Sequence, residues 1–259
     1  MTAYVKTAPP HIRANDTLSS AGRDTLLALF PAVVTAAFFS PRILASFAIG
    51  ILCALSAEIL AARLYSLKAR LYDLHSLSLA LLLALLLPQD ISLLSAGILQ
   101  FNAVFFGKMI FGGRGGFPFH PVLLGLAASA LCFPSSVEIP LILEKNNWGF
   151  LSLAAGGLYL IFRKRIFWEM PALFFLTSLL FRSTQNFQSA LLVAAAFYLI
   201  PDPEIAPLTC KGRRLLALLA GFAICLAGSS TLQIAILLLM GALSPWMDIL
   251  LAHEKKSKR

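Results

Sequence analysis

Three carboxylates lie within or directly beside apolar stretches of the sequence, where they could bind cations or protons. Glu58 sits inside an apolar run, Asp73 precedes a second, and Asp202 follows Pro201 where a third ends. Carboxylates at membrane depth indicate a path for cations or protons. Two structural alternatives stay open: Glu58 pairs with a nearby basic residue such as Arg63, and Asp73 caps a helix N-terminus.

Residues 107–125, GKMIFGGRGGFPFHPVLLG, gather glycines and prolines between two apolar stretches. Glycine permits positive φ and close backbone approach, whereas proline stops a helix. This pattern predicts irregular backbone that is buried by protein or lines a cavity. His120 in this segment either handles protons or caps a helix. Lys108 and Arg114 are expected to attract a phosphate, from a lipid headgroup or a flavin nucleotide.

Metal and nucleophile chemistry find little support. The four cysteines, which are Cys53, Cys132, Cys210 and Cys225, form no C-x-x-C pair and lie at no zinc-like spacing from a histidine. Thiols in apolar runs are expected to act as small hydrophobic groups, with an iron–sulfur role between subunits as the alternative. No catalytic triad, metal motif or Walker-type loop is present, so the sequence does not predict a self-contained hydrolase.

The composition identifies the elements that must position these groups. Hydrophobic residues make up 59% of the 259 residues and charged residues 13%, and the mean hydropathy is +0.83. A soluble domain is less apolar and more charged. Leu- and Ala-rich runs with little alternation favour membrane helices over a barrel. The net charge of +9 comes from short clusters between apolar runs, so nucleic-acid binding is not predicted.

Ten membrane helices are expected from the apolar runs. Basic residues favour alternate connections, which predicts that both termini are cytoplasmic. The polar N-terminus carries no evident cleavable signal peptide. The expected helices cover residues 25–39, 42–63, 74–88, 91–110, 120–134, 148–163, 166–182, 187–201, 213–228 and 231–251.

The runs at 74–88 and 187–201 resemble each other, since both are rich in Ser, Leu and Ala and end in Pro followed closely by Asp. With five helices per half, the two halves have opposite orientation, which predicts a site at their interface. Chance similarity of Leu-rich helices is the alternative. The resulting boundaries are a tail at 1–24, repeats at 25–134 and 149–251, an external connection at 135–148, and a basic tail at 252–259.

Motifs along essentially the whole chain resemble the RnfD/NqrB family in the same order. The family pattern G-K-x-x-[FY]-G-G-x-G-x-N-P-F-N-P-A aligns with residues 107–122, including Phe119. Other matches are Pro10-His11-Ile12-Arg13, Glu58, Asp73, Pro88, Gly156-Gly157, Trp168, Pro171, Asp202-Pro203, Thr209, Gly212-Arg213, Pro245 and Asp248. This resemblance implies an inverted five-plus-five bundle similar to that of urea transporters.

The departures concern the flavin. The family attaches FMN to a threonine in an external loop, but residues 135–148 contain no threonine, so covalent FMN is not expected. Both asparagines of the Gly-rich motif are replaced, by Phe117 and His120, and Glu204 stands in the altered eighth connection. A noncovalent flavin, riboflavin or FMN, remains an open expectation. Its candidate residues are Lys108, Gly112, Gly113, Gly115, Phe119 and His120.

The resemblance implies the D subunit of an Rnf-type complex in the bacterial cytoplasmic (inner) membrane. Such complexes couple electron flow between ferredoxin and NAD to ion translocation, so the expected partners are the other membrane and redox subunits and lipid. Glu58, Asp73 and Asp202 are the candidate ion-path residues. A flavin-free transporter or channel and a structural membrane subunit are the alternatives.

Overall fold

The computed structural model describes residues 18–65, 74–88, 90–113, 115–133, 147–181, 189–227 and 229–257. Within these ranges the regular structure is entirely helical, as expected. The helices are α1 (Leu18–Phe39), α2 (Arg42–Leu64), α3 (His75–Leu86), α4 (Leu93–Val104), α5 (Pro121–Cys132), α7 (Asn147–Phe162), α8 (Glu169–Leu180), α9 (Ser189–Ala194), α10 (Cys210–Leu226) and α11 (Ser230–Ser257). Two π-helical turns directly continue helices, η2 (Phe105–Met109) after α4 and η4 (Ala195–Leu199) after α9.

The ten helical stretches of the described chain follow the ten apolar runs in order. Three of them contain segments long and apolar enough to cross a membrane: Ser20–Phe39, Arg42–Leu64 and Ser230–Leu250. Other apolar helices in the same part of the chain have 10–17 residues, fewer than the roughly 20 residues of a typical full span. Ten crossings therefore remain a prediction.

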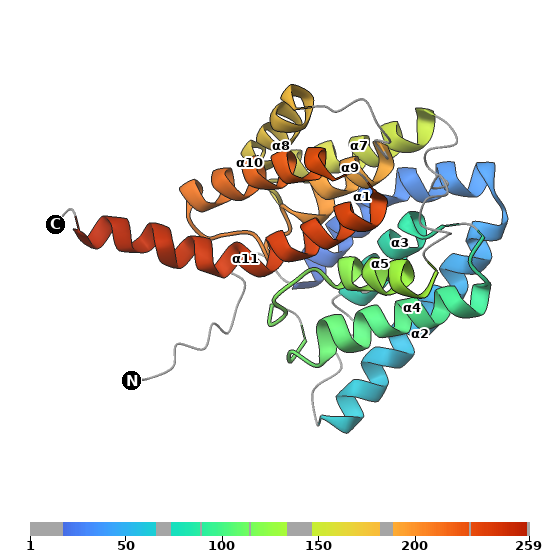
Figure 1. The fold of residues 1–259 in the computed structure, drawn as a ribbon. Coiled ribbons are helices and arrows are strands. Elements are labelled where there is room, and N and C mark those ends of the chain that lie inside the picture. The colour runs from blue at the N-terminus through green and yellow to red at the C-terminus, as the bar shows by residue number, and fades with distance from the viewer. Residues whose placement is uncertain are drawn as a thin grey trace.

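Both terminal helices extend beyond their predicted limits. α1 includes residues 18–24, and its Asp24 is buried and receives a hydrogen bond from Nε of Arg165 at 2.6 Å. This bond fixes the first turns of α1 to the connection between α7 and α8. α11 continues to Ser257 because neither glycine nor proline follows Pro245 to end it. Its C-terminal part projects beyond the other helices (Figure 1).

The helices of the first half, α2 to α5, group on one side of the molecule, and α7 to α10 group on the other (Figure 1). α3 packs against α1, α2 and α5, whereas η4 packs against α7 and α8. Nearly all residues of α3 and all those of η4 are buried. These two central elements are therefore placed to bring polar groups into the protein interior.

Glycine allows α1 and α7 to cross closely. A Cβ atom at Gly156 would overlap the carbonyl oxygen of Ala28 and the hydroxyl of Tyr198. The Tyr198 hydroxyl donates to the carbonyl oxygens of Leu153 at 3.1 Å and Ala28 at 3.3 Å. One phenol thus joins η4, α7 and α1 at the contact between the two halves.

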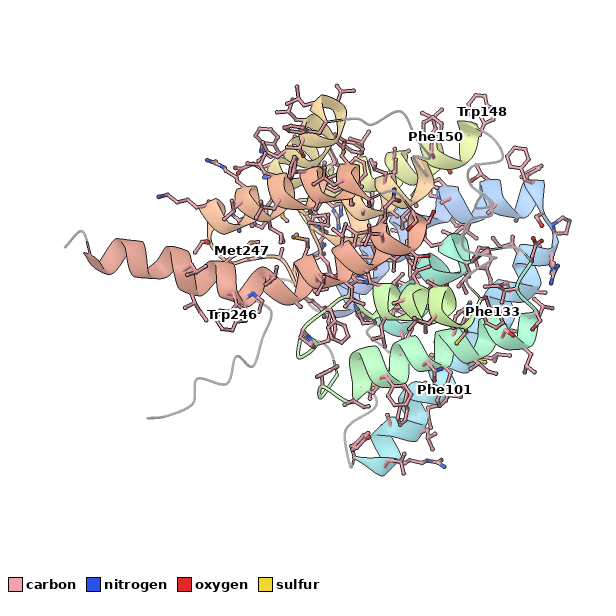
Figure 2. All side chains as sticks on the ribbon, viewed as in Figure 1. Phe101, Phe133, Trp148, Phe150, Trp246 and Met247 are labelled. Carbon is pink, nitrogen blue, oxygen red and sulfur yellow. The ribbon has the colours of Figure 1, made fainter. Side chains whose placement is uncertain are left out.

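Large apolar side chains cover much of the outer surface. Phe38, Leu131 and Phe162 are 85%, 82% and 84% exposed. Trp148 at the start of α7 and Trp246 on α11 point away from the bundle (Figure 2). An apolar surface of this extent is unfavourable in water and suits contact with lipid.

Candidate functional site

A buried ion pair joins three elements of the first half. Lys108 of η2, Glu58 of α2 and Ser76 of α3 are 1%, 2% and 2% exposed. Nζ of Lys108 lies 2.8 Å from Oγ of Ser76 and 3.4 Å from Oε2 of Glu58. The Ser76 hydroxyl donates to the same Glu58 oxygen. One carboxylate oxygen therefore accepts from both an ammonium and a hydroxyl group.

Close packing around η2 places Lys108 in the interior. A Cβ atom at the preceding residue, Gly107, would lie 2.9 Å from both Cα and Cβ of Pro121 at the start of α5. Glycine therefore lets η2 approach α5 closely. Glu58 pairs with Lys108, so the expected pairing with a basic residue is found, but the partner is not the neighbouring Arg63. The burial of Lys108 does not fit the expected contact with a lipid headgroup or a phosphate.

His120 has two roles at the contact between the halves. It is the N-cap of α5, and its Nδ1 accepts from the backbone N–H of Val122 at 3.2 Å. This confirms the capping role and places the proton of a neutral imidazole on Nε2. Nε2 lies 3.3 Å from Oδ2 of Asp202. The structure thus brings together a residue expected to bind flavin and one expected on the ion path.

A second histidine and carboxylate lie beside this pair. Nε2 of His75 is 4.0 Å from Oε1 of Glu204, and the His75 ring stacks on Phe117 with 6.0 Å between centroids. Oε2 of Glu204 accepts from the N–H of Gly115 at 3.0 Å. The connection after η4 therefore holds both α3 and the Gly-rich segment of the first half.

Backbone bonds fix the connection that carries Asp202 and Glu204. Oδ1 of Asp202 accepts from the N–H of Glu204 at 3.1 Å. Farther along, Asp248 of α11 accepts from the N–H of Leu208 at 2.7 Å and the N–H and hydroxyl of Thr209 at 3.0 and 2.9 Å. Asp248 is therefore a positioning residue, whereas Asp202 directs its other oxygen toward His120.

A cavity of about 630 Å³, part of it open to the surface, lies beside these pairs. Ligand pockets are typically about 300–1,000 Å³ and mostly apolar with a few polar groups. Its lining comes from α1, α3, α7, η4 and the connections between helices. The polar lining residues are Thr25, His75, Ser78, His120, Arg165, Tyr198 and Asp202.

The residues of this cavity fit the ring system of a neutral flavin better than a phosphate. Phe197 and Tyr198 supply aromatic surface, and His120 supplies a polar edge. The guanidinium on the lining, Arg165, already binds Asp24 and Ser20. Lys108 is not on the lining and contacts Glu58. The cavity therefore offers ring binding without an evident phosphate clamp.

The remaining predicted flavin residues form the outer part of the Gly-rich segment. Gly112, Gly113 and Gly115 have φ values of 91°, 91° and 83°, a backbone region that favours glycine. A Cβ atom at Gly112 or Gly113 would meet no atom within 4 Å, so neither glycine is required by close packing. Phe119 makes an edge contact with Phe111 at 5.8 Å between centroids. None of these four residues lines the cavity.

Some predictions concern residues outside the described chain. Asp73 and Arg114 are among them, as is nearly all of the segment 135–148 from which the FMN threonine is missing. Metal binding has no geometric support in the described residues, which contain no group of three or more His, Cys, Asp or Glu side chains suited to a metal ion.

Sequence reasoning missed Ser76 and the pairing of His75 with Glu204. Ser76 is unremarkable within a Ser- and Leu-rich run. The signal for Glu204 is its place in the altered eighth connection, and for His75 its place at a helix start. Neither signal names a partner more than one hundred residues away in the chain.

An all-helical bundle with an apolar surface and buried, paired charges defines a helical membrane protein. The chain belongs to the NQR2, RnfD, RnfE family, whose sequence model matches residues 5–145, just over half of the chain. This confirms the family resemblance.

Three similar proteins, each the D subunit of its complex, show how far the likeness extends. That of the ion-translocating oxidoreductase complex of Methanosarcina acetivorans is 29% identical over 244 residues, which cover 86% of this chain and 84% of that protein. That of the proton-translocating ferredoxin:NAD(+) oxidoreductase complex of Clostridium ljungdahlii is 26% identical, with 84% of each chain covered. That of the Na(+)-translocating ferredoxin:NAD(+) oxidoreductase complex of Acetobacterium woodii is 25% identical, with 82% and 81% covered.

Proposed function

We propose that this chain is the membrane-embedded D subunit of an Rnf-type ion-translocating electron transport complex that acts between ferredoxin and NAD. The observation that carries the proposal is similarity over more than four-fifths of the chain to proteins named as D subunits of such complexes. The subunit positions electron transfer and ion translocation within a larger assembly. Its partners are the other membrane and redox subunits.

The bundle consists of two inverted repeats in the bacterial cytoplasmic membrane, with both termini on the cytoplasmic side. Helix packing supports this arrangement. Under the five-helix offset, the packed pair α2–α4 corresponds to α8–α10, and α4–α5 corresponds to α10–α11. The pairs α1–α7 and α5–α11 each join a helix to its own equivalent. Matched pairs of this kind are expected of a twofold-related bundle.

The ion path passes the buried charges near the contact between the halves. Glu58 and Asp202 are its carboxylates in the described chain, and Asp73 is a third candidate from the sequence. Burial supports this role, because ionisable groups inside a membrane protein mark ion or proton paths. The His120–Asp202 contact joins the first half to the second, so movement between the halves would change the surroundings of Asp202.

The cavity beside His120 and Tyr198 binds a noncovalent flavin. A bound flavin would supply one- and two-electron redox chemistry. The protein would hold its ring against Phe197 and place the imidazole of His120 at its edge. The buried surroundings would restrict water. The neutral lining favours riboflavin over FMN, because Arg165 is engaged by Asp24.

Purification of the chain from its native membrane, with whatever subunits accompany it, tests this proposal. We expect copurification with redox subunits and a flavin absorbance spectrum. After denaturation the flavin should be released, with no fluorescence on this chain in a gel. Flavin retained on the denatured chain would contradict the noncovalent assignment. Isolation as a homo-oligomer that carries solute without redox partners would instead favour the flavin-free transporter.

A further inference from the structure

The contact between α2 and α4–η2, from Gly50 and Gln100 to Glu58 and Lys108, is here called the α2–α4 seam. Gly50 packs against Gln100, and Glu58 pairs with Lys108 eight residues farther along both helices. The two helices therefore run parallel. Between these contacts the seam is lined by apolar residues, with Ala54 and Ala57 completely buried.

An orphaned amide lies on this seam. Gln100 is 1% exposed, and neither its Oε1 nor its Nε2 has a hydrogen-bond partner among the residues that the structure describes. A Cβ atom at Gly50 would overlap this amide, so the glycine makes the space that it occupies. Eight residues of helix place Gln100 about 12 Å from Lys108 along the seam. An amide without a partner is costly unless something else uses it.

We propose that Glu58 and Ser76 form a binding site for a small monovalent cation of the sodium class, which Lys108 occupies as a tethered counter-ion. The site deepens the ion path proposed above and rests on it. Carboxylate and hydroxyl oxygens suit hard cations. The Lys108 ammonium lies 2.8 Å from the hydroxyl and 3.4 Å from the carboxylate oxygen, so a mobile cation would compete with it for the same two atoms. The Gln100 amide oxygen is the next polar step along the seam.

The surroundings of Lys108 allow such an exchange. Its ammonium sits on a flexible four-carbon stem and belongs to the π-helical turn η2, a feature frequent at functional sites. A second buried cation beside one carboxylate would be uncompensated, so the ammonium and the mobile cation exclude each other. Glu58 faces Lys108 from α2. On the α3 side, His75 adjoins Ser76, and beyond it lies Glu204.

Sodium-dependent unfolding of the full chain in lipid nanodiscs tests the site. The unfolding temperature is measured against NaCl, with choline chloride holding ionic strength constant, because a ligand that binds the folded state raises this temperature. Lys108→Met should lower the sodium concentration for a half-maximal shift about tenfold or more relative to wild type. Lys108→Arg, the matched control, should not lower it. Addition of Glu58→Gln to Lys108→Met should abolish the sodium response.

A Lys108→Met protein that responds to pH through Glu58 but not to sodium would reduce Lys108 to a structural counter-ion and overturn the proposal. A sodium response that survives in Lys108→Met/Glu58→Gln would overturn it as well. If Lys108→Met does not fold, Ser76→Ala provides the test: a weaker sodium response supports the site and an unchanged one refutes it. Neither electron donor nor partner subunits enter this assay, so its failure leaves the proposed subunit function standing.

Discussion

At the scale of the residue, His120 shows how one side chain links a helix start to a distant carboxylate. Its Nδ1 is occupied by the N–H of Val122, and its Nε2 faces Asp202. A second proton on the imidazole would have to displace the helix cap. The hydrogen-bonding pattern therefore favours a neutral His120 that donates to an ionised Asp202.

Substitution of Asp202 by Asn should separate ion transport from electron transfer. The amide oxygen of Asn can accept from His120 or from the N–H of Glu204, so the fold is retained, with a loss of about 1 kcal/mol from weaker hydrogen bonds. The negative charge is lost. We expect the complex in proteoliposomes to keep electron transfer and lose most ion transport, measured as ion uptake per electron transferred.

Asp248→Asn is the contrasting variant. The Asp248 carboxylate holds backbone and side-chain groups at Leu208 and Thr209, and within the described chain these hydrogen bonds involve no histidine. The variant should lower thermal stability and leave the ion-to-electron ratio of the folded complex unchanged. Normal coupling in Asp202→Asn would return Asp202 to a structural role.

Gln100→Leu should stabilise the protein. Leucine nearly matches glutamine in size and removes the buried amide that has no partner in the described chain, whose desolvation costs about 1–3 kcal/mol. The expected gain is of that order, measured by reversible unfolding in mixed micelles. Gln100→Glu, which brings a carboxyl to the same place, serves as the control and should not stabilise. A less stable leucine variant would show that the amide is satisfied, for example by water.

At the scale of the element, the α1–α7 crossing depends on glycine. Gly156→Ala should destabilise the bundle, because its methyl group overlaps backbone of Ala28 and the Tyr198 hydroxyl. Overpacking of this kind costs about 1–3 kcal/mol or more. Gly241→Ala in α11 is the control, since its Cβ would meet its nearest atom at 3.5 Å, an ordinary contact. Thermal unfolding of the two variants checks the difference, and equal stability would contradict close packing at Gly156.

The order of the helices was predictable from sequence because apolar runs and their Pro and Gly boundaries are local signals. Their partners were not. Glu58 was expected to pair near itself, but the side chain that reaches it comes from fifty residues later, across a parallel helix pair. His120 was correctly predicted as a cap, which needs only neighbouring residues. Its contact with Asp202 depends on how the halves meet, and no spacing within one run encodes that distance.

At the scale of the whole molecule, buried polar groups concentrate where the halves meet, while the outer surface is apolar. His120 and Gly115 of the first half contact Asp202 and Glu204 of the second, and the cavity takes its lining from both. Two packed halves that share a polar centre can change its access by small relative movements. The fold thus places the candidate ion and flavin residues within one region.

The native cysteines allow a direct test of orientation. Cys132 ends α5 and Cys210 begins α10, and both are exposed, whereas Cys225 is buried. With both termini cytoplasmic and ten crossings, Cys132 lies outside and Cys210 inside. In cells with an accessible outer face of the cytoplasmic membrane, a membrane-impermeant maleimide should label Cys132 and spare Cys210, because only exposed thiols react. Inverted vesicles should give the reverse pattern. Variants with Cys132→Ser or Cys210→Ser assign each signal, and labelling of both thiols from one side would refute the ten-crossing arrangement.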